Sequence, residues 1–424
     1  MKDNATDPLI DVAQLKVGMF IHLDLGWMSH PFPLSSFKLS SEDQLLVLRR
    51  LGLKQVRWSP AKSELPDDAP PAPAVVEASN PALSPEQQLK EVHRKALAAQ
   101  REALSLCEKQ YAEAAAAFKS IVDLVPREPV NSRDQSTALV SALLDKMLVE
   151  GDLNIRLLNE GAGDRGTAHA LNVSIISLLL GRAFGLGRDE MMDLGVGALL
   201  HDIGKLELPP RLRHRDEGFT SAESQVYQTH VVKGVALAKQ MDLAAGPLLV
   251  IAQHHENADG TGFPQRINVD RMSAASRIVA LVNRFDGLCN PLLVSKAMTP
   301  HEALSLMFAQ GRNRFDATML NAFIRMMGVY PPGSTVQLTD DRYALVVAVN
   351  SSRPLKPRVM VHDAKVARDE ALIVNLEDHP DLGIRRSLKP GALPRASLDY
   401  LSPRARVAYF FESVAATPSG EVSV

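Results

Sequence analysis

The sequence carries histidine and carboxylate side chains in an arrangement suited to binding metal ions. Six of its 12 histidines fall in one stretch: His169, His201, His214, His230, His254 and His255. Asp202 follows directly after one of them, and Glu256 and Asp259 follow the last pair. Imidazole combined with carboxylate, without thiolate, is a ligand set of first-row transition metals. We therefore predict a metal site from Asp202 and these histidines, except His214, whose place in RLRHR is typical of a loop.

The spacing of these residues places them on four predicted helices. In chain order they are His169 near the start of one helix, His201 and Asp202 at the end of the next, His230 in a third, and His254 and His255 at the end of a fourth. Helical bundles build metal sites from ligands that face inward in this way. Neighbours on a helix point about 100° apart, so adjacent ligands at a helix end can reach two metals. An aspartate there can bridge two ions, which would bind hydroxide and phosphate together.

The composition is that of an ordinary globular protein. The chain has 424 residues, 46% hydrophobic and 23% charged, and the formal net charge is -2. This balance excludes a strong whole-chain field for nucleic acid, and we expect no DNA binding. Cys107 and Cys289 lie far apart, which argues against a disulfide framework and fits a reducing compartment. We see no secretory signal and no apolar run of the roughly 18 to 20 residues that span a membrane, so we predict a cytoplasmic protein.

The periodicity predicts a mainly α protein in four regions. Residues 1–60 read as a small α+β N-terminal domain, with a strand in LKVGMFIHLDL, a helix in SEDQLLVLRRLGL capped by Ser40 or Ser41, and a strand in KQVRW. Residues 61–84 are a Pro/Ala-rich linker. Residues 85–330 form a helical domain with a bundle core, and residues 331–424 a β-rich C-terminal region with strands in STVQL, ALVVAVN, PRVMVHD and ALIVNL.

A long helix is expected over residues 85–125, where Ser84 and Pro85 form a helix start. Its apolar residues recur at spacings of three, four and seven: Leu97, Leu104, Cys107, Tyr111, Ala114, Phe118, Ile121 and Val125. This stripe either packs on its own domain or forms a homodimer contact through the helix. The sequence leaves both interpretations open.

Two motifs resemble the HD-GYP family. They are HDIGK at residues 201–205 and HHENADGTGFP at residues 254–264, and the resemblance extends over about residues 120–330. Members of this family are HD-superfamily metal phosphohydrolases that cleave the bacterial messenger cyclic di-GMP. The stretch LKVGMFIHLDLGWMSHPF resembles a small domain of unknown function often found ahead of them. The resemblance implies an all-helical HD-type catalytic core that holds two iron or manganese ions.

The resemblance also implies roles for individual residues. The implied metal ligands are His169, His201, Asp202, His230, His254, His255 and Asn283. Asp202 and Lys205 would be catalytic. The implied substrate-binding residues are Lys205, Gly260, Gly262, Phe263, Pro264 and Arg277. The loop from Gly260 to Pro264 either brings backbone close to a base or ribose, or is a tight turn between helices.

The chain departs from the family pattern at three places. Asn283 stands where the family has a metal-binding aspartate, and Asp286 matches a later acidic position. Arg165 stands where some members have a glutamate linked to a third metal, so we expect at most two ions. Leu292-Leu293-Val294-Ser295 replaces an Arg-Pro-Tyr-Arg-like run, which removes positive charge.

We predict an enzyme that hydrolyses cyclic di-GMP to the linear dinucleotide, with further cleavage to GMP left open. A non-catalytic module of the same fold that binds cyclic di-GMP or a protein is the second interpretation. An HD phosphohydrolase with another nucleotide substrate is the third. Signalling proteins such as diguanylate cyclases are further candidate partners.

Overall fold

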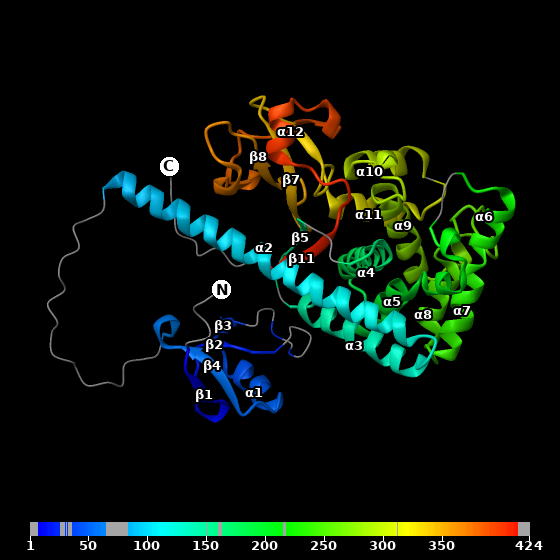
Figure 1. The fold of residues 1–424 in the computed structure, drawn as a ribbon, viewed down its shortest axis with the longest axis horizontal. Helices are drawn as coiled ribbons and strands as arrows, with labels where there is room; N and C mark the ends of the chain where they lie inside the picture. Colours follow the sequence, from blue (N-terminus) through cyan, green and yellow to red (C-terminus); the bar gives the residue numbers. More distant parts are fainter. Residues whose placement is uncertain are drawn as a thin grey trace. The chain divides into compact units, whose positions relative to one another are not determined.

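The computed structural model describes residues 7–25, 30, 32, 36–64, 84–149, 151–159, 163–214, 218–311 and 313–413 (Figure 1). The chain forms two compact units, Met1–Glu91 and Val92–Val424. Residues 65–83, most of the expected linker, lie outside the described residues. The finer division at residues 60, 84 and 330 stays a prediction.

The N-terminal unit is a small antiparallel sheet with one helix packed on it. Its strands run in the order β1-β4-β2-β3 and are β1 (Leu9–Asp11), β4 (Gln55–Ser59), β2 (Phe20–His22) and β3 (Ser36–Lys38). Helix α1 (Glu42–Arg50) begins at Ser41, whose side chain accepts a hydrogen bond from the Gln44 amide, and it buries Leu45 and Leu48. The predicted helix and closing strand are confirmed. The first predicted strand is shorter than expected, and β1 and β3 were not predicted.

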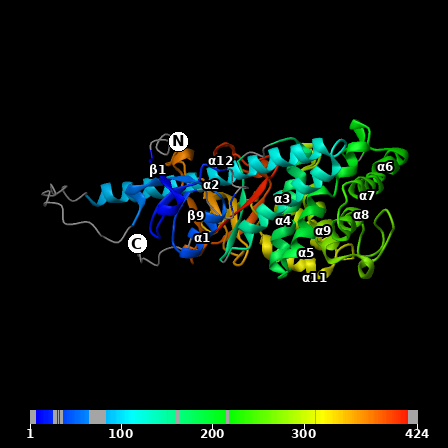
Figure 2. The same ribbon diagram turned by 90° about the horizontal axis from the view of Figure 1, so that it is seen from below.

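The second unit is mostly helical. Its helices are α2 (Pro85–Leu124), α3 (Pro129–Met147), α4 (Arg165–Ala183), α5 (Arg188–Leu200), α6 (Ser221–Gln228), α7 (His230–Gln240), α8 (Ala245–Gln253), α9 (Ala274–Cys289), α10 (Pro300–Gln310), α11 (Ala317–Met327) and α12 (Arg395–Leu401). Figures 1 and 2 show α3, α4, α5, α7, α8 and α9 gathered into one body. The apolar run 173–180 of α4 is buried, since α5, α9 and β11 (Tyr409–Ser413) all pack on this helix.

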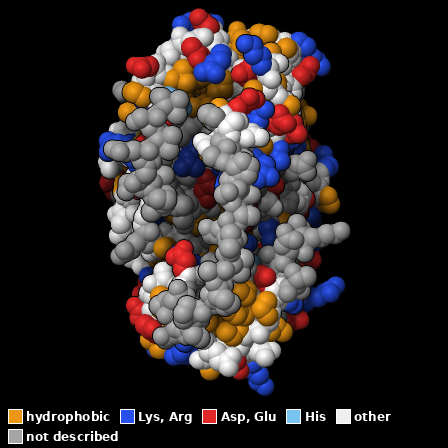
Figure 3. Space-filling model, turned by 90° about the vertical axis from the view of Figure 1, so that its left-hand side faces the viewer, with side chains coloured by type: hydrophobic (Ala, Val, Ile, Leu, Met, Phe, Trp, Pro, Cys, Tyr) orange, Lys and Arg blue, Asp and Glu red, His pale blue; other side chains and the backbone are white. Residues whose placement is uncertain are grey.

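The surface and the helices agree with two expectations from composition. Among the described residues, no helix is long and apolar enough to cross a membrane. On the face drawn in Figure 3, basic and acidic side chains are interspersed.

The long helix α2 matches the expected range and packs its second half on its own unit. The stripe residues from Cys107 onward are buried, and the Cys107 thiol lies 3.9 Å from the Phe411 carbonyl oxygen. Gln100 both accepts from the Ile373 amide, at 2.9 Å, and donates to the Ile373 carbonyl, at 3.2 Å. This supports the packing interpretation for the second half of the stripe. A dimer contact through helix 85–125 stays a prediction.

The C-terminal strands form an antiparallel sheet that includes one strand from the helical region. Its order is β10-β6-β7-β5-β11, with β8 paired to β7 and β9. The bounds are β5 (Leu153–Leu157), β6 (Thr335–Leu338), β7 (Tyr343–Asn350), β8 (Arg358–Val361), β9 (Ile373–Asn375) and β10 (Ile384–Leu388). The four predicted strands are present. Strand β5 was not predicted, and it pairs with β7 and β11, which lie far along the chain.

The segment leading into β11 is tied to the helix that carries the first predicted metal ligand. The Asn172 side chain on α4 accepts from the Tyr409 amide at 3.0 Å and donates to the Val407 carbonyl at 3.0 Å. It also donates to Asp286 Oδ1 on α9 at 2.8 Å. Because all these groups are buried, the network fixes the C-terminal segment against α4 and α9.

Candidate metal centre

The structure brings together the six histidine and aspartate residues predicted as ligands. They form two groups that share Asp202, and within each group one ligand atom per residue lies within 4.8 Å of the others. The first group is His169, His201 and Asp202, and the second is Asp202, His230, His254 and His255. As the spacing predicted, the ligands lie near helix ends: α4 begins four residues before His169, α5 ends at Leu200, and α8 ends at Gln253. His230 is the first residue of α7.

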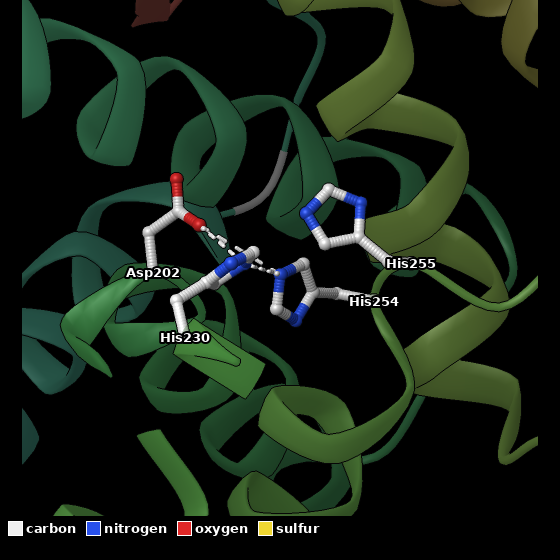
Figure 4. A group of neighbouring side chains, drawn as sticks. All are labelled: Asp202, His230, His254 and His255. Atoms are coloured by element: carbon white, nitrogen blue, oxygen red, sulfur yellow. Dashed lines mark hydrogen bonds and ion pairs between the residues drawn. The ribbon is translucent and has the colours of Figure 1, made fainter. Parts of the chain in front are cut away.

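The two oxygens of Asp202 face different histidines. Asp202 Oδ2 lies 3.5 Å from His169 Nε2 and 3.4 Å from His201 Nε2. Asp202 Oδ1 lies 3.4 Å from His230 Nε2 and 3.7 Å from His254 Nε2, as the dashed lines of Figure 4 mark. A carboxylate so divided has the arrangement of a ligand that bridges two ions.

Paired ring nitrogens point at each other on each side. The two Nε2 atoms of His169 and His201 are 3.1 Å apart, and those of His230 and His254 are 3.3 Å apart. Two nitrogens bound to one ion at about 2.1 Å each would be separated by roughly 3 Å, depending on the angle between the bonds. The spacing therefore fits two nitrogens that converge on a shared cation.

The other ring nitrogen of each of these four histidines is already used. Nδ1 of His201, His230 and His254 lies 2.7, 2.5 and 2.8 Å from the carbonyl oxygens of Ala198, Tyr227 and Ile251. His169 Nδ1 lies 2.6 Å from Asp286 Oδ2. Since carbonyl oxygens only accept, the three first-named rings carry a proton on Nδ1. Their Nε2 lone pairs are then free to bind a metal, which is the usual outer-shell arrangement.

Two buried atoms of the cluster have no hydrogen-bond partner among the described residues. They are Asp202 Oδ1 and His255 Nε2. A buried polar atom without a hydrogen bond costs about 1 to 3 kcal/mol, more for a charged group. A cation between the two groups would satisfy both atoms, so the residues present fit a divalent metal site.

Charge and burial act differently on the histidines. Burial acts to lower the pKa of His169, but hydrogen bonds with Asp202 and Asp286 outweigh it and raise the pKa to about 9. Burial lowers the pKa of His230 to about 4 and that of His254 well below its usual range. Burial acts to raise the pKa of Asp202, yet the Lys205 ammonium group outweighs it and holds the pKa well below its usual range. The centre thus offers an ionised carboxylate and the neutral imidazoles of His230 and His254 to a cation, whereas His169 must release a proton when it binds one.

Gly204 of the HDIGK motif allows two segments of the centre to meet. It lies in the 3₁₀ helix η5 (Ile203–Glu207), and a Cβ here would overlap the His230 carbonyl oxygen and the Gly234 backbone. Only glycine permits this approach of η5 to α7. The contact brings His230 beside Asp202.

The loop after His255 is clamped by a buried carboxylate. Glu256 accepts from the amides of Gln265, Arg266 and Ile267 at 2.7, 3.2 and 3.2 Å. A Cβ on Gly262 would overlap the backbone of residues 255–257, so the loop lies directly on the chain that carries the histidine pair. The loop is therefore a tight turn that is fixed to the metal centre.

Phe263 is held by that loop against the ligands. Its ring stacks on His255, with centroids 4.5 Å apart, and lies edge-on to His230 at 6.3 Å. Gly260 has a left-handed φ of 74°, and the bond between Phe263 and Pro264 is cis. The structure thus accounts for the Gly-Phe-Pro tripeptide by packing. Substrate binding by Gly260, Gly262, Phe263 and Pro264 stays a prediction.

Lys205 lies between a carboxylate and an aromatic ring. Its ammonium group pairs with Asp202 Oδ2 and lies 5.3 Å from the centre of the Tyr227 ring. Burial acts to lower the pKa of Lys205, but the Asp202 charge outweighs it and raises the pKa. The lysine therefore stays cationic beside the cluster.

Two predicted residues lie outside these contacts. Arg277 pairs with Asp316 at 3.1 Å and donates to the Met272 carbonyl at 3.0 and 3.2 Å. Asn283 lies on α9, half-buried, and its side chain has no hydrogen-bond partner among the described residues. It precedes Asp286 by three residues, which puts both on one face of the helix.

Sequence reasoning did not give Asp286 a role, and the structure does. Its Oδ2 bonds His169, while its Oδ1 accepts from Asn172 and Asn290 at 2.8 Å each. A carboxylate that orients a ligating histidine is a common outer-shell element of metal sites. The signal in the sequence was its match to the family's later acidic position. Its partner on α4 could not be inferred from spacing.

Family models match the same two parts of the chain. An HD domain model matches residues 154–319, and a domain of unknown function, DUF3391, matches residues 9–135. With the cluster of histidine and aspartate, the first match makes this an HD-domain protein with a divalent metal site. Both matches agree with the resemblance to the HD-GYP family that the motifs HDIGK and HHENADGTGFP carry.

Three curated relatives are named as cyclic di-GMP phosphodiesterases. PA4108 of Pseudomonas aeruginosa is 28% identical over 359 residues, which cover 83% of this chain and 84% of the relative. PdeB of Borreliella burgdorferi is 24% identical over 223 residues, 52% of this chain and 59% of the relative. The response regulator RpfG of Xanthomonas campestris is 29% identical over 166 residues, 38% of this chain and 44% of the relative. The chain thus spans most of the first relative and less than two thirds of the other two.

Proposed function

We propose that this protein is a metal-dependent phosphodiesterase that hydrolyses cyclic di-GMP to the linear dinucleotide. The observation that carries the proposal is the division of the Asp202 oxygens between two pairs of convergent Nε2 atoms. The relatives named above support the substrate, because PA4108 is similar over most of the chain. Cleavage onward to GMP is a second step that the same site could perform.

The centre would hold two iron or manganese ions. His169, His201 and Asp202 would bind one, and Asp202 with His230, His254 and His255 the other. Asn283 would add a neutral amide oxygen from α9. When bound, the ions supply Lewis-acid activation of water and neutralise charge on the phosphate.

The chain's own residues position the reaction. Asp202, ionised and buried, fixes the distance between the two groups of histidines. Lys205 keeps a positive charge next to the cluster, where a phosphate oxygen gains negative charge as the bond to the ribose oxygen breaks. Phe263 covers the His255 ring and excludes water from that side. The loop backbone from Gly260 to Pro264 would contact a base or ribose.

A receptor without turnover is the second candidate function. Asn283 replaces a carboxylate by a neutral amide, and residues 292–295 lack the arginines of the family pattern. Both changes alter the charges that would act on the metals and the phosphate during hydrolysis, and neither removes a residue that the fold depends on. Such a receptor would still bind cyclic di-GMP.

We also propose a cytoplasmic location. Cys107 and Cys289 are free and buried, which suits a reducing compartment. A homodimer and diguanylate cyclase partners stay predictions.

Anaerobically purified protein, loaded with Fe(II) or Mn(II), tests the proposal when cyclic di-GMP is followed by chromatography. We expect the linear dinucleotide from wild type and none from His201→Ala. Asn283→Asp should turn over faster than wild type if a carboxylate there strengthens the site. Binding without product would support the receptor. If the protein neither binds nor cleaves cyclic di-GMP, both candidate functions are wrong.

A further inference from the structure

Arg165 and Arg406 lie beside the metal centre without a role in any of the contacts described so far. Arg165 is the first residue of α4 and precedes His169 by four positions. Residues four apart share a helix face, about 6 Å along the axis. Arg406 comes from the segment that leads into β11, far away in the sequence.

The Arg165 guanidinium is aligned by the network that orients His169. Its Nε and Nη2 donate to the Asn290 carbonyl oxygen at 3.3 and 3.0 Å. The Asn290 side chain donates in turn to Asp286 Oδ1 at 2.8 Å, and Asp286 Oδ2 bonds His169. The remaining nitrogen, Arg165 Nη1, is buried and has no partner among the described residues.

Arg406 is held by its neighbour in the chain. The Val407 amide donates to Asn290 Oδ1 at 2.9 Å, and the Val407 carbonyl accepts from Asn290 Nδ2 and Asn172 Nδ2 at 3.0 Å each. The Arg406 guanidinium donates to the Leu292 carbonyl at 3.5 Å. Leu292 opens the run that lacks the family's arginines. Positive charge missing from that run is thus supplied by a residue that lies on it.

The Asp286 and Asp202 carboxylates act on the Arg165 charge without forming an ion pair with it. Among the described residues, neither arginine makes an ion pair with a carboxylate. Arg165 donates to the Asn290 carbonyl and Arg406 to the Leu292 carbonyl, two positions further along the same segment, so the two cations lie near each other. Burial lowers the pKa of Arg165, and the Arg406 charge lowers it further. Arg165 is half-buried and Arg406 is exposed, and an anion bound between the two guanidinium groups would offset their repulsion.

Arginine suits a phosphate because its planar fork can donate two hydrogen bonds to two phosphate oxygens. Cyclic di-GMP carries two phosphodiesters, and only one is cleaved in a turnover. Lys205, paired with the bridging carboxylate, lies at the cluster itself, whereas Arg165 lies a helical turn from His169. The arginines are therefore placed for the phosphate that does not react.

We infer that Arg165 and Arg406 form a second phosphate subsite, which binds the non-reacting phosphodiester of a cyclic dinucleotide. This inference rests on the proposed function. It also explains why the chain tolerates Leu292-Leu293-Val294-Ser295, since the charge has moved to two other places in the sequence.

The experiment compares two substrates on the Mn(II)-loaded full chain. Cyclic di-GMP has two phosphates, and bis(p-nitrophenyl) phosphate has one. For Arg165→Gln and Arg406→Gln we expect kcat/KM for cyclic di-GMP to fall about 10- to 100-fold, the loss of a hydrogen bond to a charged group. The single-phosphate substrate should change less than about threefold, because it does not reach the subsite. Arg395→Gln removes an exposed arginine of α12 that pairs with Asp399 and should match wild type on both substrates.

Metal content and melting temperature are measured on each variant, so that a folding defect is seen directly. An equal fall on both substrates, or no fall on either, overturns the subsite. If wild type cleaves the single-phosphate substrate but neither cleaves nor binds cyclic di-GMP, the proposed function fails first and the subsite fails with it. If wild type binds cyclic di-GMP without cleavage, the same variants are compared by Kd. A rise of about 10-fold or more would then support the subsite while the catalytic proposal fails.

Discussion

The two sides of the Asp202 carboxylate are built differently. On the Oδ2 side, His169 is half-buried and contacts a second carboxylate, Asp286, and despite burial the two carboxylates raise its pKa to about 9. On the Oδ1 side, His230 is fully buried, lies 4.8 Å from the Tyr227 ring, and burial lowers its pKa to about 4. On the first side His169 must lose a proton before it can bind a metal ion, whereas the second side presents His230 already neutral and fixed by packing. The two positions should therefore respond differently to substitution.

Loss of the shared ligand, Asp202, should abolish metal binding on both sides of the centre. Asp202→Asn keeps the shape of the side chain but removes the charge that the histidines and Lys205 surround. We expect metal content near zero and a fall in kcat of about 10³-fold or more. Metal analysis of dialysed protein and the chromatographic assay measure both. Retention of one ion at wild-type affinity would show that Asp202 does not bridge.

Loss of the outer carboxylate should affect the His169 side alone. In Asp286→Asn, an amide can no longer accept from His169, Asn172 and Asn290 together. Loss of such a partner lowers metal affinity about 10- to 100-fold. Titration with Mn(II) should show one weakened position and one unchanged. Asp189→Asn, in the first turn of α5, is the matched control and should leave both positions as in wild type. An equal loss of Mn(II) affinity at both positions would contradict the claim that Asp286 acts on the His169 side alone.

The metal ligands on both sides of Asp202 could be predicted from the sequence, because they lie at helix ends that residue types such as glycine indicate. His201 is the first residue of HDIGK, which contains Gly204, and His254 and His255 precede a turn rich in glycine. The outer network was not open to prediction. It joins α4, α9 and the segment before β11 through Asn172, Asn290 and Val407.

Strand β5 was missed for the same physical reason. LNIRL is short and lies among helices, and its partners β7 and β11 come about 200 residues or more later. Pairing at that separation depends on the whole fold, and local periodicity does not report it. Asn283 illustrates a further limit. Its match to a metal-binding aspartate of the family followed from the resemblance, while its contacts depend on how α9 packs.

A substitution in the clamped loop should disturb the packed side. Gly262→Ala places a Cβ onto the backbone of residues 255–257 and forces the loop away. We expect a loss of about 1 to 3 kcal/mol in the free energy of unfolding, measured with urea, together with looser binding on the His230 side. Gly287→Ala is the matched control, since a Cβ there meets nothing within 4 Å. It lies on α9 and should raise stability by up to about 1 kcal/mol. If both variants changed the free energy of unfolding alike, Gly262 would not lie as close to the backbone of residues 255–257 as the structure shows.

The smallest effect should come from Tyr227, whose ring contacts both Lys205 and His230. The ammonium group lies 5.3 Å from the ring centre, and the ring also packs on His230. A cation over an aromatic face gains about 0.5 to 2 kcal/mol, and phenylalanine retains that face. Tyr227→Phe keeps the ring face and loses the hydroxyl that hydrogen-bonds Lys205, and we expect kcat to stay within about threefold of wild type because the Asp202 pair still holds the lysine. Tyr227→Leu, which fills space without the ring quadrupole, should lower kcat about threefold to tenfold with metal content unchanged. If Tyr227→Phe instead matched Tyr227→Leu, the hydroxyl rather than the ring would position the lysine, and packing alone would not account for this side of the centre.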